Sequence, residues 1–262
     1  MNAGEAFARR VRAPDGAGGG PVPAATGLVT PASPARAATG LAKVTAAVVA
    51  AAGALPGHQV IDLGCGSGQL SIALAERGAR VLAIDGNQAV LSGLEAAARQ
   101  RGLVGIEVLA KPVDSLTLPI GSADLIVTSY ALHRLRDADK ERLLAAAFQW
   151  LRPGGTLIVA DMMFGRGGSS QDRAIIRTKV RSLARKGIGG WWRIAKNSYR
   201  YLVRVKEHPV SISAWTTLFA RAGFGSITAS RIVNEAGLVS GKRPAQGPPG
   251  QAAPPPPSPP RF

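Results

Sequence analysis

The chain has 262 residues, of which 46% are hydrophobic, and its formal net charge is +16. This much apolar material excludes a chain that is disordered throughout, and the length suits one α/β domain with tails. The single cysteine excludes a disulfide framework and a cysteine-ligated zinc site. Because the chain has only three histidines, we expect no metal centre.

The excess positive charge is confined to one part of the sequence. Residues 60–161 contain ten basic and eleven acidic side chains, whereas residues 162–210 contain twelve basic and two acidic ones. A charge imbalance of this kind bears on the partners of a protein rather than on its fold. We therefore expect a nearly neutral core followed by a strongly basic segment.

The two ends of the chain differ in composition from its middle. Residues 1–38 are rich in Ala, Gly and Pro, and residues 244–262 contain nine prolines and no acidic residue. Neither stretch can bury enough apolar surface to offset its ordering entropy, so we predict two disordered tails around a domain over 39–243. The longest uncharged apolar stretch, Val44 to Pro56, is shorter than the ~20 residues of a membrane-spanning helix. We expect a cytoplasmic protein.

Short apolar runs that are typical of buried parallel strands alternate with helical patterns. The predicted strands cover 58–63, 80–84, 106–110, 123–130 and 155–161, and the predicted helices cover 69–77, 87–101 and 137–151. After the basic segment, a capped helix over 211–222 precedes two strand-like runs near 226–234 and 237–242. This alternation predicts an α/β fold, a doubly wound parallel sheet that binds ligands outside the carboxyl ends of its strands.

A glycine-rich turn follows the first predicted strand, in the sequence VIDLGCGSGQL over residues 60–70. Gly64, Gly66 and Gly68 allow the backbone to approach a ligand closely. Asp62 comes two residues before the first of these glycines. A carboxylate at the mouth of the turn disfavours a phosphate and favours a cationic ligand, in contrast to a dinucleotide site.

Two more acidic residues follow later strands. Asp85 ends the second predicted strand, in VLAIDGN, where it could accept hydrogen bonds from both hydroxyls of a ribose. Asp114 follows the third strand, in KPVDSLTLP, where it could accept from the exocyclic amine of adenine while the Ser115 amide donates to the ring. Each acid also has a plainer interpretation, Asp85 as the cap of the next helix and Asp114 as a turn residue.

In order and spacing, five stretches resemble the successive motifs of class I S-adenosylmethionine-dependent methyltransferases. They are VIDLGCGSG, VLAIDGN, the Asp of PVDSLTLP, ADLIVTSYALHRL and LRPGGTLIVAD, within about residues 58–161. The branch most similar to them contains the ubiquinone/menaquinone-biosynthesis enzymes and many small-molecule methyltransferases. The resemblance implies a Rossmann-like, seven-stranded sheet whose last strand is antiparallel, a lid insertion after the fifth strand, and S-adenosylmethionine as the cofactor.

The resemblance also implies roles for individual residues. The glycine loop would wrap the methionine part of the cofactor, Asp85 would hold the ribose, and Ser129 would sit near the sulfonium. The cofactor-binding residues implied in this way are Asp62, Gly64, Cys65, Gly66, Gly68, Asp85, Gly86, Asp114, Ser115 and Ser129.

Methyl transfer from a sulfonium is an in-line displacement, in which the protein mainly aligns donor and acceptor and excludes water. His133, in SYALHRL, is the candidate catalytic base, with a structural role in capping the loop as the alternative. Tyr130 is a candidate substrate residue or a packing residue. The segment lacks the Asn/Asp-Pro-Pro-Tyr pattern of enzymes that methylate the exocyclic amine of adenine. Cys65 lies within the glycine loop, where it cannot be the nucleophile of a cytosine-C5 enzyme.

The basic segment, residues 162–210, combines cations with aromatic side chains. As a lid over the acceptor, it would supply the substrate residues Arg177, Arg181, Trp191 and Trp192. Its cations suit an anionic metabolite, an anionic membrane surface that delivers a lipid-like or quinone-like acceptor, or RNA. A solvated helix face with core aromatics is the plain alternative.

We therefore expect a methyltransferase whose acceptor is small or amphipathic, with an anionic metabolite as one form. The rival hypotheses are an RNA methyltransferase and a non-catalytic module that binds S-adenosylmethionine or RNA through the basic segment.

Overall fold

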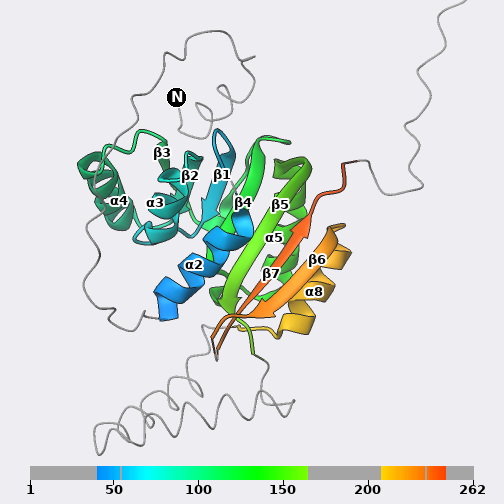
Figure 1. The fold of residues 1–262 in the computed structure, drawn as a ribbon. Helices are drawn as coiled ribbons and strands as arrows, with labels where there is room; N and C mark the ends of the chain where they lie inside the picture. Colours follow the sequence, from blue (N-terminus) through cyan, green and yellow to red (C-terminus); the bar gives the residue numbers. More distant parts are fainter. Residues whose placement is uncertain (1–39, 54, 165–207, 234, 246–262) are drawn as a thin grey trace, which may run out of the picture.

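The computed structural model describes residues 40–53, 55–164, 208–233 and 235–245 (Figure 1). The predicted tail over 1–38 and nearly all of the predicted tail over 244–262 lie outside these ranges. Residues 165–207, which make up most of the basic segment, also lie outside them.

Within the described residues, seven strands form one sheet in the order β3-β2-β1-β4-β5-β7-β6. They are β1 (Gln59–Leu63), β2 (Arg80–Asp85), β3 (Ile106–Ala110), β4 (Ala123–Ser129), β5 (Leu151–Met162), β6 (Gly225–Arg231) and β7 (Ala236–Lys242). Strands β1 to β5 pair in parallel, and β7 pairs antiparallel with both β5 and β6. This topology confirms the predicted α/β fold with an antiparallel last strand.

Helices cover both faces of the sheet (Figure 1). They are α2 (Gly40–Ala52), α3 (Gln69–Ala75), α4 (Gln88–Gln100), α5 (Asp137–Trp150) and α8 (Ile212–Arg221), with two single-turn 3-10 helices, η1 (Val113–Ser115) and η2 (Leu132–Arg134). One apolar cluster joins α2, α3 and α4 to the sheet, and a separate cluster joins α5 and α8 to it. A parallel sheet covered on both faces requires strands that are apolar on both sides, which explains the continuous Val, Ile and Leu runs.

Helix α2 was not predicted, because its residues were recognised only as an apolar stretch too short to span a membrane. Its Val44, Val48 and Val49 are buried against the sheet. In the described residues, no helix has both the length and the apolar character needed to cross a membrane.

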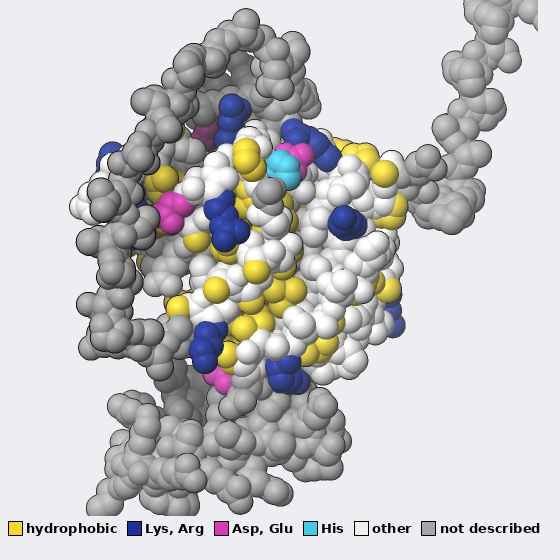
Figure 2. Space-filling model, viewed as in Figure 1, with side chains coloured by type: hydrophobic (Ala, Val, Ile, Leu, Met, Phe, Trp, Pro, Cys, Tyr) yellow, Lys and Arg dark blue, Asp and Glu magenta, His cyan; other side chains and the backbone are white. Residues whose placement is uncertain are grey.

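The charged side chains are dispersed over the face of the domain that Figure 2 shows. On the face seen in Figure 2, Lys and Arg side chains lie in separate places among uncharged groups rather than in one patch. This distribution agrees with the nearly neutral composition of residues 60–161.

The chain leaves the sheet after β5 and returns to it before α8. Near the first point, the Met163 N–H donates to the Glu235 carbonyl at 2.9 Å. At the second, the His208 N–H donates to the His133 carbonyl and the Lys140 ammonium donates to the His208 carbonyl, both at 2.5 Å. The described residues on either side of 165–207 are therefore hydrogen-bonded to the rest of the domain.

Candidate functional site

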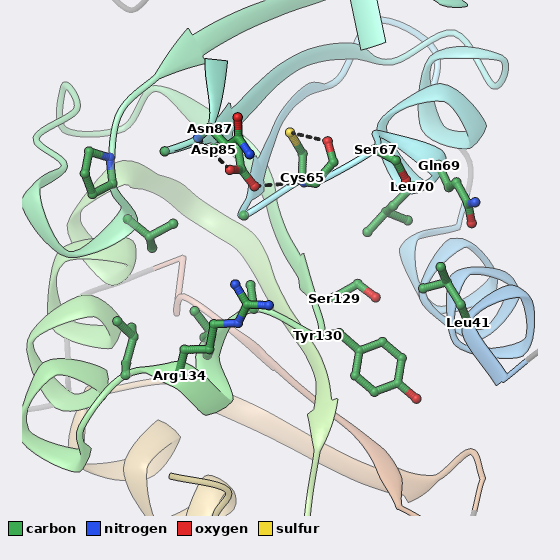
Figure 3. Close-up of a pocket in the computed structure, with 18 of the residues that line it drawn as sticks. Leu41, Cys65, Ser67, Gln69, Leu70, Asp85, Asn87, Ser129, Tyr130 and Arg134 are labelled. Carbon is green, nitrogen blue, oxygen red and sulfur yellow. Dashed lines mark hydrogen bonds between the residues drawn. The ribbon is translucent and has the colours of Figure 1, made fainter. Parts of the chain in front are cut away.

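A cavity of about 560 Å³ opens at the carboxyl edge of the sheet (Figure 3). Its walls come from α2, the glycine loop after β1, the end of β2, η1 and the loop after β4. The neighbouring positions of β1 and β4 in the strand order create this site, because the connections on either side of them run in opposite directions.

Two glycines of the loop are required by close packing. A Cβ atom on Gly64 would lie 2.5 Å from the Cβ of Ala131, and one on Gly68 would lie 2.2 Å from Cδ1 of Leu94. Both glycines also have positive φ values, 70° and 75°. Gly64 lines the cavity, whereas Gly68 does not, so Gly68 acts by bringing α3 and α4 together.

Asp85 lies at the wall of the cavity, as predicted for a ribose-binding acid. Its Oδ2 accepts a hydrogen bond from the Gly66 N–H at 3.0 Å, and its Oδ1 accepts from the Asn87 N–H at 2.9 Å. These two amides fix the carboxylate, and each oxygen can accept a further hydrogen bond. Gly86 and Cys65 line the same wall. Burial, followed by the charges of Asp62 and Asp85, raises the pKa of the Cys65 thiol far above its ordinary value.

Asp62 lies beneath the glycine loop rather than at the mouth of the cavity, which corrects the predicted position. Its side chain is 1% exposed, and the Ser71 hydroxyl donates to its Oδ2 at 2.6 Å. Burial raises the pKa of this carboxyl from 3.8 to about 7, the charge of Asp85 raises it further, and the Ser71 hydrogen bond opposes both effects. Asp62 thus closes the loop by joining β1 to α3.

The turn η1 places only one of its two predicted residues at the cavity. Asp114 lines it, as expected for a residue that meets an adenine. Ser115 does not, because its N–H and its hydroxyl both donate to the Pro112 carbonyl, at 3.3 and 3.1 Å. The structure therefore corrects the expectation that the Ser115 amide is available to a ligand.

Ser129 and Tyr130 lie where β4 ends and both line the cavity. The Ser129 hydroxyl is buried and has no hydrogen-bond partner among the described residues. Tyr130 has a φ of 52°, a left-handed conformation that is rare for residues other than glycine and is often found at functional sites. Burial, followed by the charges of Glu235 and Asp161, raises the pKa of the Tyr130 phenol.

His133, the predicted base, does not line the cavity although its neighbours Leu132 and Arg134 do. It is 7% exposed, and its Nδ1 and backbone N–H both contact the Asp161 carboxylate, each at 2.7 Å. Because a carboxylate only accepts, the hydrogen bond assigns the ring proton to Nδ1. These contacts hold the loop, as in the alternative interpretation of His133, and its assignment as a catalytic base stays a prediction.

Several cavity residues escaped the sequence analysis. Leu41 and Thr45 come from α2, which was not predicted, and Asn87 caps α4 by accepting from the Ala89 N–H at 3.0 Å. Arg134 lies within the quoted SYALHRL segment but was not singled out. The predicted substrate residues Arg177, Arg181, Trp191 and Trp192 lie outside the described residues.

The cavity fits a nucleoside that carries a positive charge. Two carboxylates, Asp85 and Asp114, stand at one wall, and the unpartnered Ser129 hydroxyl offers a further polar contact. Among the described residues, no group of three His, Cys, Asp or Glu side chains is arranged to hold a metal ion.

Comparisons with known proteins agree with this geometry. Residues 60–155 match a family model described as a methyltransferase domain. An uncharacterized methyltransferase of Synechocystis sp. is 33% identical over 107 residues, which cover 41% of this chain and 48% of the relative. The ubiquinone/menaquinone biosynthesis C-methyltransferase of Vibrio vulnificus is 35% identical over 114 residues, covering 42% of this chain and 43% of the relative. The chain thus spans less than half the length of both curated relatives.

Solved structures share the fold. The crystal structure of an S-adenosylmethionine-dependent methyltransferase from Mesorhizobium loti has a TM-score of 0.54 and 20% sequence identity, and the match covers 76% of this chain and 98% of that one. Residues 60–155 therefore match a methyltransferase domain, the sheet has the fold of S-adenosylmethionine-dependent methyltransferases, and the residues that line the cavity agree with S-adenosylmethionine as the cofactor.

Proposed function

We propose that this protein transfers the methyl group of S-adenosylmethionine to a small or amphipathic acceptor of anionic character. The observation that carries the proposal is the convergence of the glycine loop, Asp85 and Asp114 on one cavity at the carboxyl edge of the sheet. The relative from Vibrio vulnificus is named for C-methylation in ubiquinone and menaquinone biosynthesis, which supports an acceptor of this size and class.

S-adenosylmethionine supplies a methyl group on a sulfonium, so its leaving group is already activated. The residues of this chain then have to bind, orient and exclude water. Asp85, held by two backbone amides, would bind the ribose hydroxyls, and Asp114 would bind the adenine amine. Cys65 and Gly66 of the glycine loop would contact the methionine part, and Ser129 and Tyr130 would stand next to the reacting centre.

The further parts of the proposal concern the acceptor. The assignments of Arg177, Arg181, Trp191 and Trp192 to substrate, and of the basic segment to a lid or a membrane contact, stay predictions. They are consistent with the topology, because the described residues that flank 165–207, Met163 and His208, are hydrogen-bonded to the domain.

Calorimetric titration with S-adenosylhomocysteine tests the cofactor site. Asp85→Ala removes charge-assisted hydrogen bonds to the ribose, so binding should weaken roughly 10- to 100-fold. Glu76→Ala is the matched control, because Glu76 is an exposed acid outside the cavity. If the unmutated protein binds neither S-adenosylmethionine nor S-adenosylhomocysteine, the proposed function is wrong.

Transfer of a tritiated methyl group into fractions of a cell lysate tests the acceptor class. We expect label in a small-molecule or lipid fraction, and we expect Asp85→Ala to abolish it. Label that enters RNA and resists protease would contradict the proposed acceptor and favour the rival RNA methyltransferase.

A further inference from the structure

Arg134 extends into the cavity from η2 (Figure 3). Its side chain is exposed, and among the described residues its guanidinium makes no hydrogen bond and no ion pair. An arginine left in this state inside a cavity presents five N–H donors to whatever enters.

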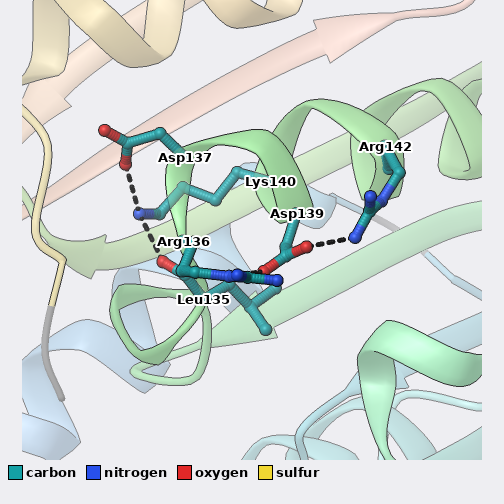
Figure 4. Close-up of polar contacts among 6 residues, drawn as sticks. All are labelled: Leu135, Arg136, Asp137, Asp139, Lys140 and Arg142. Carbon is teal, nitrogen blue, oxygen red and sulfur yellow. Dashed lines mark hydrogen bonds and ion pairs between the residues drawn. The ribbon is translucent and has the colours of Figure 1, made fainter.

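The other cations of the same stretch are paired. Figure 4 shows the Arg136 and Arg142 guanidinium groups at the Asp139 carboxylate, and the Lys140 ammonium 3.0 Å from the Asp137 carboxylate. Asp137 and Asp139 therefore already form ion pairs, and within this part of the described chain Arg134 is the cation that is available to bind a ligand.

The loop holds Arg134 in place from both sides. On one side, the backbone and the ring of His133 are bound by Asp161 at 2.7 Å. On the other side, the Leu135 carbonyl accepts from Lys140, which is fully buried, at 2.8 Å. Since the backbone around Arg134 is fixed, binding a ligand restricts only its side chain, and such preorganisation favours affinity.

The charge of Arg134 needs a counterpart inside the cavity. Asp85 and Asp114 are the acids of the cavity wall, and no carboxylate of the described residues lies within 4.0 Å of the Arg134 guanidinium. A sulfonium in the same cavity would repel the guanidinium unless an anion lay beside them. A guanidinium pairs most strongly with carboxylates and phosphates, which it can bind through two parallel hydrogen bonds.

We infer that Arg134 binds a carboxylate or phosphate group of the methyl acceptor, and that Asp161, His133 and Lys140 position it for this task. The inference rests on the proposed function and narrows the substrate class to acceptors with such a group. The alternative anionic partner for Arg134 is the carboxylate of the cofactor's own methionine part.

Two adenosine ligands separate these sources. S-adenosylhomocysteine carries the amino-acid carboxylate, and methylthioadenosine lacks it. We expect Arg134→Gln to bind both ligands as the unmutated full-length protein does, within about twofold. If the variant loses affinity for S-adenosylhomocysteine but not for methylthioadenosine, Arg134 belongs to the cofactor site and the inference is overturned.

Small anions then probe the acceptor side. The protein saturated with S-adenosylhomocysteine is titrated with benzoate, with inorganic phosphate and with neutral benzamide in 150 mM salt. We expect at least one anion to bind more tightly than benzamide, and Arg134→Gln to weaken that binding at least about tenfold, as expected for a charge-assisted hydrogen bond. Arg134→Lys should keep part of the affinity, because lysine keeps the charge but cannot form the two parallel hydrogen bonds of a guanidinium.

Arg136→Gln is the matched control, since Arg136 lies on the same loop but outside the cavity. It should bind the anions as the unmutated protein does, which separates Arg134 from the many other cations of the chain. Equal anion binding by the unmutated protein and Arg134→Gln overturns the inference while leaving the methyltransferase proposal intact. If the unmutated protein fails to bind S-adenosylhomocysteine, both this inference and the methyltransferase proposal are overturned.

Discussion

Replacing Asp62 with asparagine should stabilise the protein at neutral and alkaline pH and have little effect in acid. Asp62 is fully buried, and burial raises its pKa from 3.8 to about 7. Between these two values the folded protein binds a proton that the unfolded chain has released, so stability falls as the pH rises. Asparagine cannot ionise, and its side-chain oxygen can still accept the hydrogen bond that Ser71 donates at 2.6 Å.

The size of the effect follows from the pKa shift. One pKa unit corresponds to about 1.4 kcal/mol, so a rise from 3.8 to about 7 gives an upper limit of about 4 kcal/mol. Below pH 3.8 the carboxyl is protonated in both states and contributes no pH dependence. The contribution of the neutral carboxyl is therefore lost progressively between about pH 4 and pH 7, and it stays lost above pH 7.

Urea unfolding of the unmutated protein and Asp62→Asn at matched pH values from 4 to 9 measures this difference. As the pH rises from 4 to about 7, the free energy of unfolding of the variant should increase relative to that of the unmutated protein by up to about 4 kcal/mol. Above pH 7 this difference should stay constant. Asp139→Asn is a control of opposite sign, because the hydrogen bond from Arg136 lowers the pKa of Asp139, so its contribution is lost as the pH falls. A difference for Asp62→Asn that is constant with pH, or that moves against the variant as the pH rises, would refute the reasoning.

Three further predictions concern other residues of the described domain. Gly64→Ala should lower the free energy of unfolding in urea by at least about 1–2 kcal/mol because Gly64 has a positive φ. The close contact of the new Cβ with Ala131 should add a further cost. Adding Ala131→Gly should recover the cost of that contact but not the cost of the positive φ. Lys140→Met should lower the free energy of unfolding by about 3 kcal/mol, because the Leu135 and His208 carbonyls lose their buried donor. Lys43→Met, on the exposed side of α2, should leave the free energy of unfolding almost unchanged. Equal losses of stability in the two variants would contradict the assigned contacts. Cys65, whose thiol pKa is raised by burial, should react with a disulfide reagent at pH 8 at least about tenfold more slowly in the folded protein than in urea, and an equal rate would contradict the burial.

The positions of the strands along the chain and the glycine loop could be predicted from the sequence because both leave local patterns. A parallel strand covered on both faces is a continuous apolar run, and β1, β2 and β4 all have this form. Asp85 could be placed because it ends such a run, at the edge where ligands bind. The helix α2 lacked a comparable signal, because Ala and Val occupy most of its positions on every side.

The directions of individual side chains could not be predicted in the same way. Asp62 lies in a strand that is buried on both faces, so its spacing from Gly64 does not reveal that it points toward Ser71. His133 was assigned to chemistry and Arg134 was overlooked, although they are adjacent. The two residues differ in their contact with Asp161, which is 28 residues further along the chain and binds His133 but not Arg134. Contacts over such distances in sequence leave no periodic trace.

The contact between Lys140 and His208 also has a consequence for engineering. Because the chain is held at Met163 and again at His208, the 43 residues from 165 to 207 lie between two fixed points of the framework. The entropy of closing such a connection changes by only about 0.6 kcal/mol for each doubling of its length. Met163 and His208 are therefore natural junctions at which the connection from another methyltransferase domain could be exchanged, which would test the predicted role of this segment in the choice of acceptor.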